Sequence, residues 1–177
     1  MKKYSISIPL NHDAHIFSKK CQRLMYNTLS TRISYNEGVD PHINLISGTT
    51  DQIDIIVRNI EKFDYKNKKN CKILGFGILI TPKPLIFMRF SNSIFLKEIR
   101  NFLLRETFSR WDTLTETVQE EIWFPKSTLA YKNFSFDDLP RMLGSLKDLD
   151  YNITMEVSEL SVIDFTEKEH EVKRFSI

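Results

Sequence analysis

The chain has 177 residues, a length that fits one domain able to bury a core without disulfides, so we predict a single domain over residues 1–177. Its formal net charge of +2, from 25 basic and 23 acidic residues, is too balanced to indicate a nucleic-acid coat or a membrane patch. Two cysteines without a CxxC pattern disfavour disulfides and a zinc site, and no signal peptide or bilayer-spanning run is evident, so we expect a cytoplasmic protein without metal, cofactor or membrane contact.

Hydrophobic periodicity in the first part of the chain predicts strand, helix, strand and helix in that order. The segments Tyr4–Pro9 and His42–Ser47 alternate with period two, as half-buried strands do. Between them, residues 13–29 carry apolar side chains at helical spacing, and Asp13 is the expected N-cap. A second helix is expected after the polar cap Thr49–Asp51.

The remaining chain is predicted to add one hairpin, two helices and four strands. In order these are a hairpin over 71–81 and 84–90 with Lys83 at its turn, a helix from Ser93 to Phe108, a strand over Ser127–Tyr131, a helix capped by Ser135 with Pro140 in its first turn, and strands over 151–157, 160–165 and 170–175. The pattern indicates an α+β fold with mostly antiparallel sheets and helices on their outer faces.

One short motif occurs twice. Pro-His-Ile-Asn-Leu at 41–45 and Pro-Lys-Ser-Thr-Leu at 125–129 align without gaps, and a capped helix is expected after each. Period-two geometry places His42 and Asn44 on one face of their strand, and Lys126 and Thr128 on one face of theirs. If two similar lobes are related by an approximate two-fold axis, these four polar side chains converge on one cleft. Such a cleft suits a small anion or a phosphodiester.

The segments PHINLISG and WFPKSTLAY resemble the 2H phosphoesterase superfamily, which includes bacterial 2′-5′ RNA ligase-like proteins and cyclic phosphodiesterases. Its signature is two copies of His-x-Thr/Ser, about half a domain apart. The resemblance implies a two-lobed pseudo-symmetric fold in which antiparallel sheets line a central cleft with helices outside. It also implies metal-independent chemistry on 2′,3′-cyclic or 2′-5′ phosphodiesters, with one histidine as general base, the other as general acid, and hydroxyls holding the phosphate.

This chain departs from that signature at two positions. Asn44 stands where the first motif has Thr or Ser, and its amide can still donate an N–H to a phosphate oxygen. Lys126 stands where the second histidine belongs; an unperturbed lysine titrates near ~10.4, so it neutralises phosphate but is a poor base. A positioned acid or base contributes on the order of 10²–10⁴-fold to a rate. We therefore expect binding of a nucleotide, cyclic oligonucleotide or RNA end, with weak or absent hydrolysis.

Two alternatives stay open at this point. In the first, the chain is an active phosphodiesterase in which His42 transfers the proton while Lys126 stabilises the phosphorane or protonates the leaving oxygen. In the second, the same fold is a non-catalytic protein-interaction module. His12 and His15, spaced three apart, have no evident third metal ligand and are left unassigned.

Aromatic and basic residues near the second motif extend the predicted site. Tyr131 is predicted to lie on the face of Lys126 and Thr128 and is the better candidate to stack on a base. Trp123 is a second stacking candidate, whereas packing in the core is the default for Phe124. Arg89 and Lys83 are expected to extend a basic rim.

Overall fold

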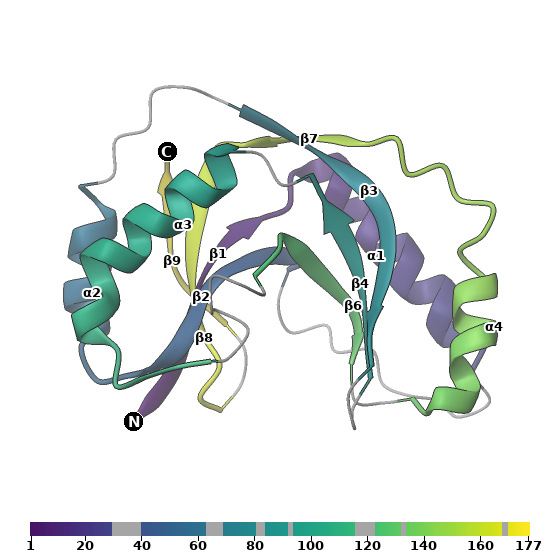
Figure 1. Cartoon of the computed structure of the whole chain (residues 1–177), viewed down its shortest axis with the longest axis horizontal. Coiled ribbons are helices and arrows are strands. Elements are labelled where there is room, and N and C mark those ends of the chain that lie inside the picture. The colour runs from purple at the N-terminus through teal and green to yellow at the C-terminus, as the bar shows by residue number, and fades with distance from the viewer. Residues whose placement is uncertain are drawn as a thin grey trace.

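Two antiparallel sheets with helices on their outer sides make up the protein (Figure 1). The computed structural model describes residues 1–29, 40–62, 69–80, 84–91, 94–115, 123–131, 134–167 and 170–177. This architecture confirms the predicted α+β class with mostly antiparallel pairing. Within the described ranges, no helix has the length and apolar character needed to cross a bilayer.

The first sheet has five strands in the order β5-β2-β1-β8-β9. Its strands are β1 (Lys2–Pro9), β2 (His42–Thr50), β5 (Thr113–Leu114), β8 (Glu159–Asp164) and β9 (His170–Ser176). The short strand β5 was not predicted; it pairs with the end of β2 that the sequence analysis had assigned to a helix cap. The backbones of β2 and β5 approach closely there, since a Cβ atom at Gly48 would lie 2.0 Å from the carbonyl oxygen of Thr113. Only glycine fits at that position.

The second sheet has four strands in the order β6-β4-β3-β7. Its strands are β3 (Lys69–Leu79), β4 (Leu85–Phe90), β6 (Lys126–Tyr131) and β7 (Thr154–Val157). The antiparallel pairing of β3 with β4 confirms the predicted hairpin, while Lys83 at its expected turn lies outside the described residues. The outer strand β7 begins three residues later than predicted.

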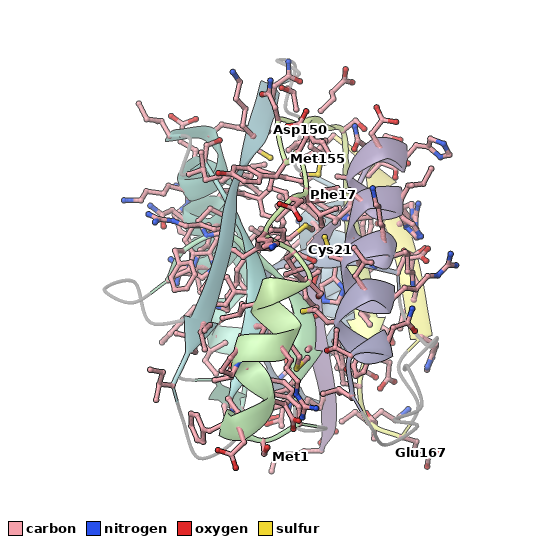
Figure 2. All side chains as sticks on the ribbon, turned by 90° about the vertical axis from the view of Figure 1, so that its right-hand side faces the viewer. Met1, Phe17, Cys21, Asp150, Met155 and Glu167 are labelled. Carbon is pink, nitrogen blue, oxygen red and sulfur yellow. The ribbon has the colours of Figure 1, made fainter. Side chains whose placement is uncertain are left out.

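Two of the described helices pack against the sheet that does not contain the strand before them. They are α1 (His12–Asn27), α2 (Ile53–Ile60), α3 (Ile94–Thr107) and α4 (Leu139–Gly144), with single 3-10 turns η1 (Phe108–Arg110) and η3 (Phe136–Asp138). Helix α1 follows a strand of the first sheet but packs with α4 and the second sheet, whereas α3 follows a strand of the second sheet and packs with α2 and β2. Figure 2 shows α1 beside α4, with Phe17 and Cys21 on the inward side of α1.

Helix starts and ends differ from the predicted ones where side-chain hydrogen bonds decide them. Asn11, not Asp13, caps α1, because its Oδ1 accepts a hydrogen bond of 3.1 Å from the backbone N–H of Ala14. Phe108 was predicted within the third helix but lies in η1 and is 65% exposed, because the α-helix ends at Thr107. Helix α2 starts at Ile53, after the predicted cap.

The predicted start near Ser135 is confirmed. The carboxylate of Asp138 accepts hydrogen bonds from the backbone N–H and the hydroxyl of Ser135, at 2.9 and 2.8 Å. This arrangement satisfies donors at the start of η3, which continues into α4. Pro140 lies in the first turn of α4, where its missing N–H costs no helical hydrogen bond.

Candidate functional site

The two repeated motifs have the same local backbone irregularity. The pairing of β1 with β2 shifts by one residue between positions 6 and 7 of β1, which leaves Leu45 without a partner in register. The pairing of β4 with β6 shifts between positions 86 and 87 of β4, which leaves Leu129 without one. Leu45 and Leu129 are equivalent in the repeat, and both are buried, at 0% and 2% exposed. Each motif therefore contains a β-bulge at the same residue.

The entry into each motif strand is also equivalent. The carbonyl oxygen of Pro41 accepts a hydrogen bond of 3.0 Å from the backbone N–H of Leu10, just beyond β1. The carbonyl oxygen of Pro125 accepts one of 3.1 Å from the backbone N–H of Phe90, at the end of β4. Matching bonds and matching bulges show that the sequence repeat is a structural repeat, so the predicted two-lobed, pseudo-symmetric arrangement is confirmed.

The second bulge determines which way Tyr131 faces. Strict alternation along β6 would place Tyr131 on the face opposite Lys126, because the two positions differ by an odd number. Because one residue is skipped, Tyr131 pairs with Leu85, while Thr128 pairs with Phe87. Leu85 and Phe87 are two residues apart on β4 and share a face, so their partners share a face too. Tyr131 thus lies on the side of Lys126 and Thr128, and it is 42% exposed. The predicted face is reached through a bulge that the sequence analysis did not foresee.

Trp123 joins the two motifs through a hydrogen bond. Its indole Nε1–H, three residues before Lys126, donates a hydrogen bond of 3.2 Å to the carbonyl oxygen of Asn44. The strands β2 and β6 lie close together there (Figure 1). The guanidinium of Arg100, on α3, lies 5.0 Å from the centre of the indole ring. Trp123 is only 8% exposed, so the prediction that it stacks on a ligand base is not supported by its position.

His42 is half-buried at the start of β2, and its ring orientation is defined. Its Nδ1 lies 3.0 Å from the carbonyl oxygen of Asp40. Because a carbonyl oxygen only accepts, Nδ1 carries the hydrogen and Nε2 is the free acceptor of the neutral ring. Burial lowers the pKa of His42, more than the nearby carbonyl and carboxylate of Asp40 raise it. The ring is therefore neutral near pH 7, as a general base must be.

Lys126 occupies the equivalent position on β6 in a different electrostatic setting. It is half-buried, its Nζ lies 4.7 Å from the centre of the Phe124 ring, and burial lowers its pKa. Across the strand pair it faces Arg89 of β4. Among the described residues, neither cation is close enough to a carboxylate to form an ion pair. Two adjacent positive charges without such partners attract anions.

The two predicted phosphate-gripping positions differ in accessibility. Thr128 is exposed on β6, whereas Asn44 is half-buried on β2. The Asn44 Oδ1 atom is buried and has no hydrogen-bond partner within the described part of the chain. Buried amide oxygens are usually satisfied, so this acceptor is available to a donor that enters the site. The amide nitrogen remains the donor that the sequence argument assigned to phosphate.

A partly open pocket of about 190 Å³ lies beside His42 on the first sheet. It is lined by Pro9, Asp40, His42, Ser161, Ile163, Glu171 and Arg174. Lys126 is not part of this lining, so the pocket lies beside the first motif and not between the two motifs. Sequence reasoning missed the contributions of β8 and β9, because only strand pairing brings these distant segments beside the first motif.

The other titratable side chains singled out in the sequence lie outside the two motifs. His15 Nδ1 is 3.8 Å from Oδ1 of Asp40, next to this cavity. In the ranges that the structure covers, no three His, Cys, Asp or Glu side chains are grouped so as to hold a metal ion. Cys21 and Cys71 are free and buried, and burial raises the pKa of each thiol to about 12.

Comparison with solved structures finds other proteins of the same fold. No protein-family model matches the chain, and no curated protein sequence matches it. In contrast, LigT of E. coli complexed with 3′-AMP superposes with a TM-score of 0.59 over 99% of this chain and 97% of LigT, at 9% identity.

Two further solved structures have the same fold. TT0787 of Thermus thermophilus has a TM-score of 0.61 at 11% identity, over 98% of this chain and 97% of that protein. A protein described as a phosphoesterase has a TM-score of 0.59 at 10% identity, over 99% of this chain and 98% of that protein. The predicted fold is therefore confirmed, and the chain has the LigT fold over almost its whole length. At these identities the likeness establishes the fold alone.

Proposed function

We propose that the chain binds a nucleotide or oligonucleotide phosphodiester between its two motif strands and hydrolyses it weakly or not at all. The observation that carries the proposal is the pair of cations Lys126 and Arg89, which are cross-strand neighbours and have no carboxylate partner among the described residues. Structures of the same fold support this choice of ligand, since E. coli LigT was solved in complexes with 3′-AMP, ATP, NADP+ and phosphate.

Charge supports a main phosphate contact at the second motif strand. Lys126 and Arg89 bring two positive charges on adjacent strands, and Thr128 adds an exposed hydroxyl. The space beside His42 is lined instead by Asp40 and Glu171, with Arg174 as the one Lys or Arg side chain among its described lining residues. A phosphodiester anion is attracted to the cations Lys126 and Arg89 and not to the acidic space beside His42.

The missing second histidine supports weak turnover. The neutral His42, with its Nε2 unprotonated, suits the removal of a proton from water or a ribose hydroxyl. Departure of the leaving oxygen then needs a proton from a second group, a role that falls to Lys126 in the proposed site. A lysine ammonium releases its proton less readily than an imidazolium, because its ordinary pKa is about four units higher. Binding without efficient cleavage is the expected result.

One observation favours the active-enzyme alternative. Burial lowers the pKa of Lys126, and a lower pKa makes its ammonium a better proton donor. In that reading, His42 accepts the proton of the nucleophile while Lys126 protonates the leaving oxygen. The two readings share a ligand and a site, and they differ only in the rate of cleavage.

The binding test compares Lys126→Ala with a matched control. Lys97 is an exposed lysine on the outer helix α3, so Lys97→Ala removes the same charge away from the motif strands. Affinities for 2′,3′-cyclic nucleotides, 2′-5′ dinucleotides and cyclic dinucleotides are measured by titration calorimetry. A charge-assisted hydrogen bond contributes about 1.5–3 kcal/mol, so we expect Lys126→Ala to weaken binding by at least about 10-fold. Lys97→Ala should leave binding unchanged.

The turnover test uses the same ligands and detects products by chromatography. We expect little product from the native protein, none from His42→Ala, and about 10²–10⁴-fold more from Lys126→His than from the native protein. Robust cleavage by the native protein would support the active phosphodiesterase instead. If no phosphodiester binds or is cleaved, the proposal fails and the protein-interaction module becomes the better reading.

We also propose that the protein resides in the reducing cytoplasm. Both of its cysteines are free thiols buried in the interior. Free cysteines are typical of reducing compartments, whereas secreted domains of modest size use them in disulfides. Fractionation of cells that express a tagged chain tests this location, and recovery from a secreted fraction would contradict it.

A further inference from the structure

The residue two places before each motif side chain contacts that side chain in both lobes. In the first motif, the carbonyl oxygen of Asp40 lies 3.0 Å from Nδ1 of His42 and orients the imidazole. In the second, Nζ of Lys126 lies over the ring of Phe124, 4.7 Å from its centre. Positions 40 and 124 are equivalent, because each directly precedes the proline with which the repeat begins. The same position therefore contacts the motif side chain in both lobes, by different chemistry.

Proline restricts the backbone at both of these positions. Asp40 directly precedes Pro41 and Phe124 directly precedes Pro125, and a residue before proline favours extended backbone because the proline ring clashes with other conformations. The carbonyl oxygens of the two prolines also accept backbone hydrogen bonds from the end of the neighbouring strand, at 3.0 and 3.1 Å. The backbone that carries the Asp40 carbonyl and the Phe124 ring is therefore well fixed.

The ring of Phe124 is held by a second aromatic ring. Its centre lies 5.2 Å from that of Phe87, with the two planes tilted by 51°, a spacing at which aromatic pairs attract. Phe87 is 5% exposed and lies against Gly77, its partner on β3, where a Cβ atom would be 2.4 Å from the ring. Phe124 is half-buried. Its ring therefore presents a fixed surface to Lys126.

The ring gives the Lys126 ammonium a reason to stay beside its own strand. Burial lowers the pKa of Lys126, which shows that its ammonium is partly removed from water. The negative face of an aromatic ring attracts a cation within about 6 Å, so the Phe124 ring replaces part of the lost hydration. With no ring at position 124, the long and flexible lysine side chain would carry its ammonium out to solvent.

Resting on the proposed function, we propose that Phe124 is a positioning residue, whose ring holds the Lys126 ammonium in place for the phosphodiester. It acts through Lys126, just as the Asp40 carbonyl acts through His42 in the first motif. The role needs the face of an aromatic ring. Tyr at position 124 keeps that face, whereas Leu keeps an apolar side chain but leaves the ammonium unattached.

The first experiment observes the contact without a ligand. Protons above the face of an aromatic ring resonate upfield, so NMR detects the contact in the methylene signals of Lys126, which are assigned by their loss in Lys126→Ala. We expect upfield signals in the native protein and in Phe124→Tyr, and ordinary values in Phe124→Leu. Phe102→Leu is the matched control and should leave the signals upfield, because it removes the ring that lies 5.4 Å from the guanidinium of Arg105 on α3.

One outcome of this experiment needs no variant at position 124. Ordinary values in the native protein would overturn the proposal, even if Phe124→Leu failed to fold.

The second experiment tests whether Phe124 acts through Lys126. Titration calorimetry with adenosine and guanosine 2′,3′-cyclic phosphates compares the native protein, Phe124→Leu, Lys126→Ala and the double variant. From the strength of a partly buried cation–π contact, we expect Phe124→Leu to weaken binding about 5-fold in the native protein. It should have no effect once Lys126 is replaced by Ala. Phe124→Tyr and Phe102→Leu should keep the native affinity.

The outcomes separate this role from the proposed function. An equal loss of affinity on Phe124→Leu in both backgrounds would show that Phe124 contacts the ligand directly, and would overturn the positioning role while leaving the proposed function intact. Unchanged affinity in Phe124→Leu would overturn it as well. If the native protein binds neither compound, the proposed function is what fails, and the NMR signals still decide whether the ring holds the ammonium.

Discussion

The two tryptophans provide a test of how the motif strands are held together. Both are buried, at 9% for Trp111 and 8% for Trp123, and each indole N–H donates one hydrogen bond. Trp123 bonds to the Asn44 carbonyl in the other motif at 3.2 Å, whereas Trp111 bonds to the hydroxyl of Thr107 in the preceding helix at 3.1 Å. Replacing either tryptophan by Phe removes one hydrogen bond and the same volume of buried side chain. Only Trp123→Phe removes a contact between the motifs.

The cost of each change follows from these contacts. One hydrogen bond contributes about 1 kcal/mol, and the smaller ring of Phe adds a loss of packing of similar size, so we expect each variant to lose about 2 kcal/mol of unfolding free energy. For a chain of this length, that loss lowers the melting temperature by about 4–8 °C. Calorimetry measures this change, and nucleotide titration measures affinity. Trp123→Phe should weaken binding severalfold, whereas Trp111→Phe should not. An equal effect of both variants on affinity would refute the reasoning.

Three further outcomes are expected. Below pH 6.5 the free energy of unfolding should decrease as the pH is lowered, because His42 becomes protonated in the unfolded state before it does in the folded state, where its pKa is lowered. His42→Gln should flatten this pH dependence in urea titrations. Gly77→Ala should destabilise by about 1–3 kcal/mol, because its Cβ would lie 2.4 Å from the Phe87 ring, and an unchanged urea midpoint would contradict that contact. Asn11→Ala should cost about 1 kcal/mol in thermal unfolding, because the N–H of Ala14 loses its acceptor, whereas Asn11→Asp should retain stability.

The overall fold was predictable because its signals are local. Alternation in Tyr4–Pro9 and His42–Ser47 marks strands whatever they pair with, and the repeated Pro-X-x-polar-Leu motif indicates two related lobes. Helix positions were predicted to within a few residues. Their ends were less predictable, because a single side-chain hydrogen bond, such as that of Asn11, decides where a helix starts.

The candidate site was predictable only in part, because some of its features arise from pairing between distant segments. His42, Asn44, Lys126 and Thr128 were proposed from the motif itself. The bulge that turns Tyr131 toward them depends on the register with β4, which no local pattern encodes. Glu171 and Arg174 belong to a strand whose alternation is ordinary in sequence, and they meet the first motif only through the order of strands in the first sheet.

The exchange of helices and strands between the layers has a consequence for how the chain can be divided. The fragment 1–80 holds two strands of one sheet and one strand of the other, together with a helix whose packing partners lie mostly in the fragment 84–177. Neither fragment can close its own interior. Separately expressed halves should therefore remain unfolded alone and regain structure only when mixed, which makes the chain a candidate for split-protein complementation at residues 81–83.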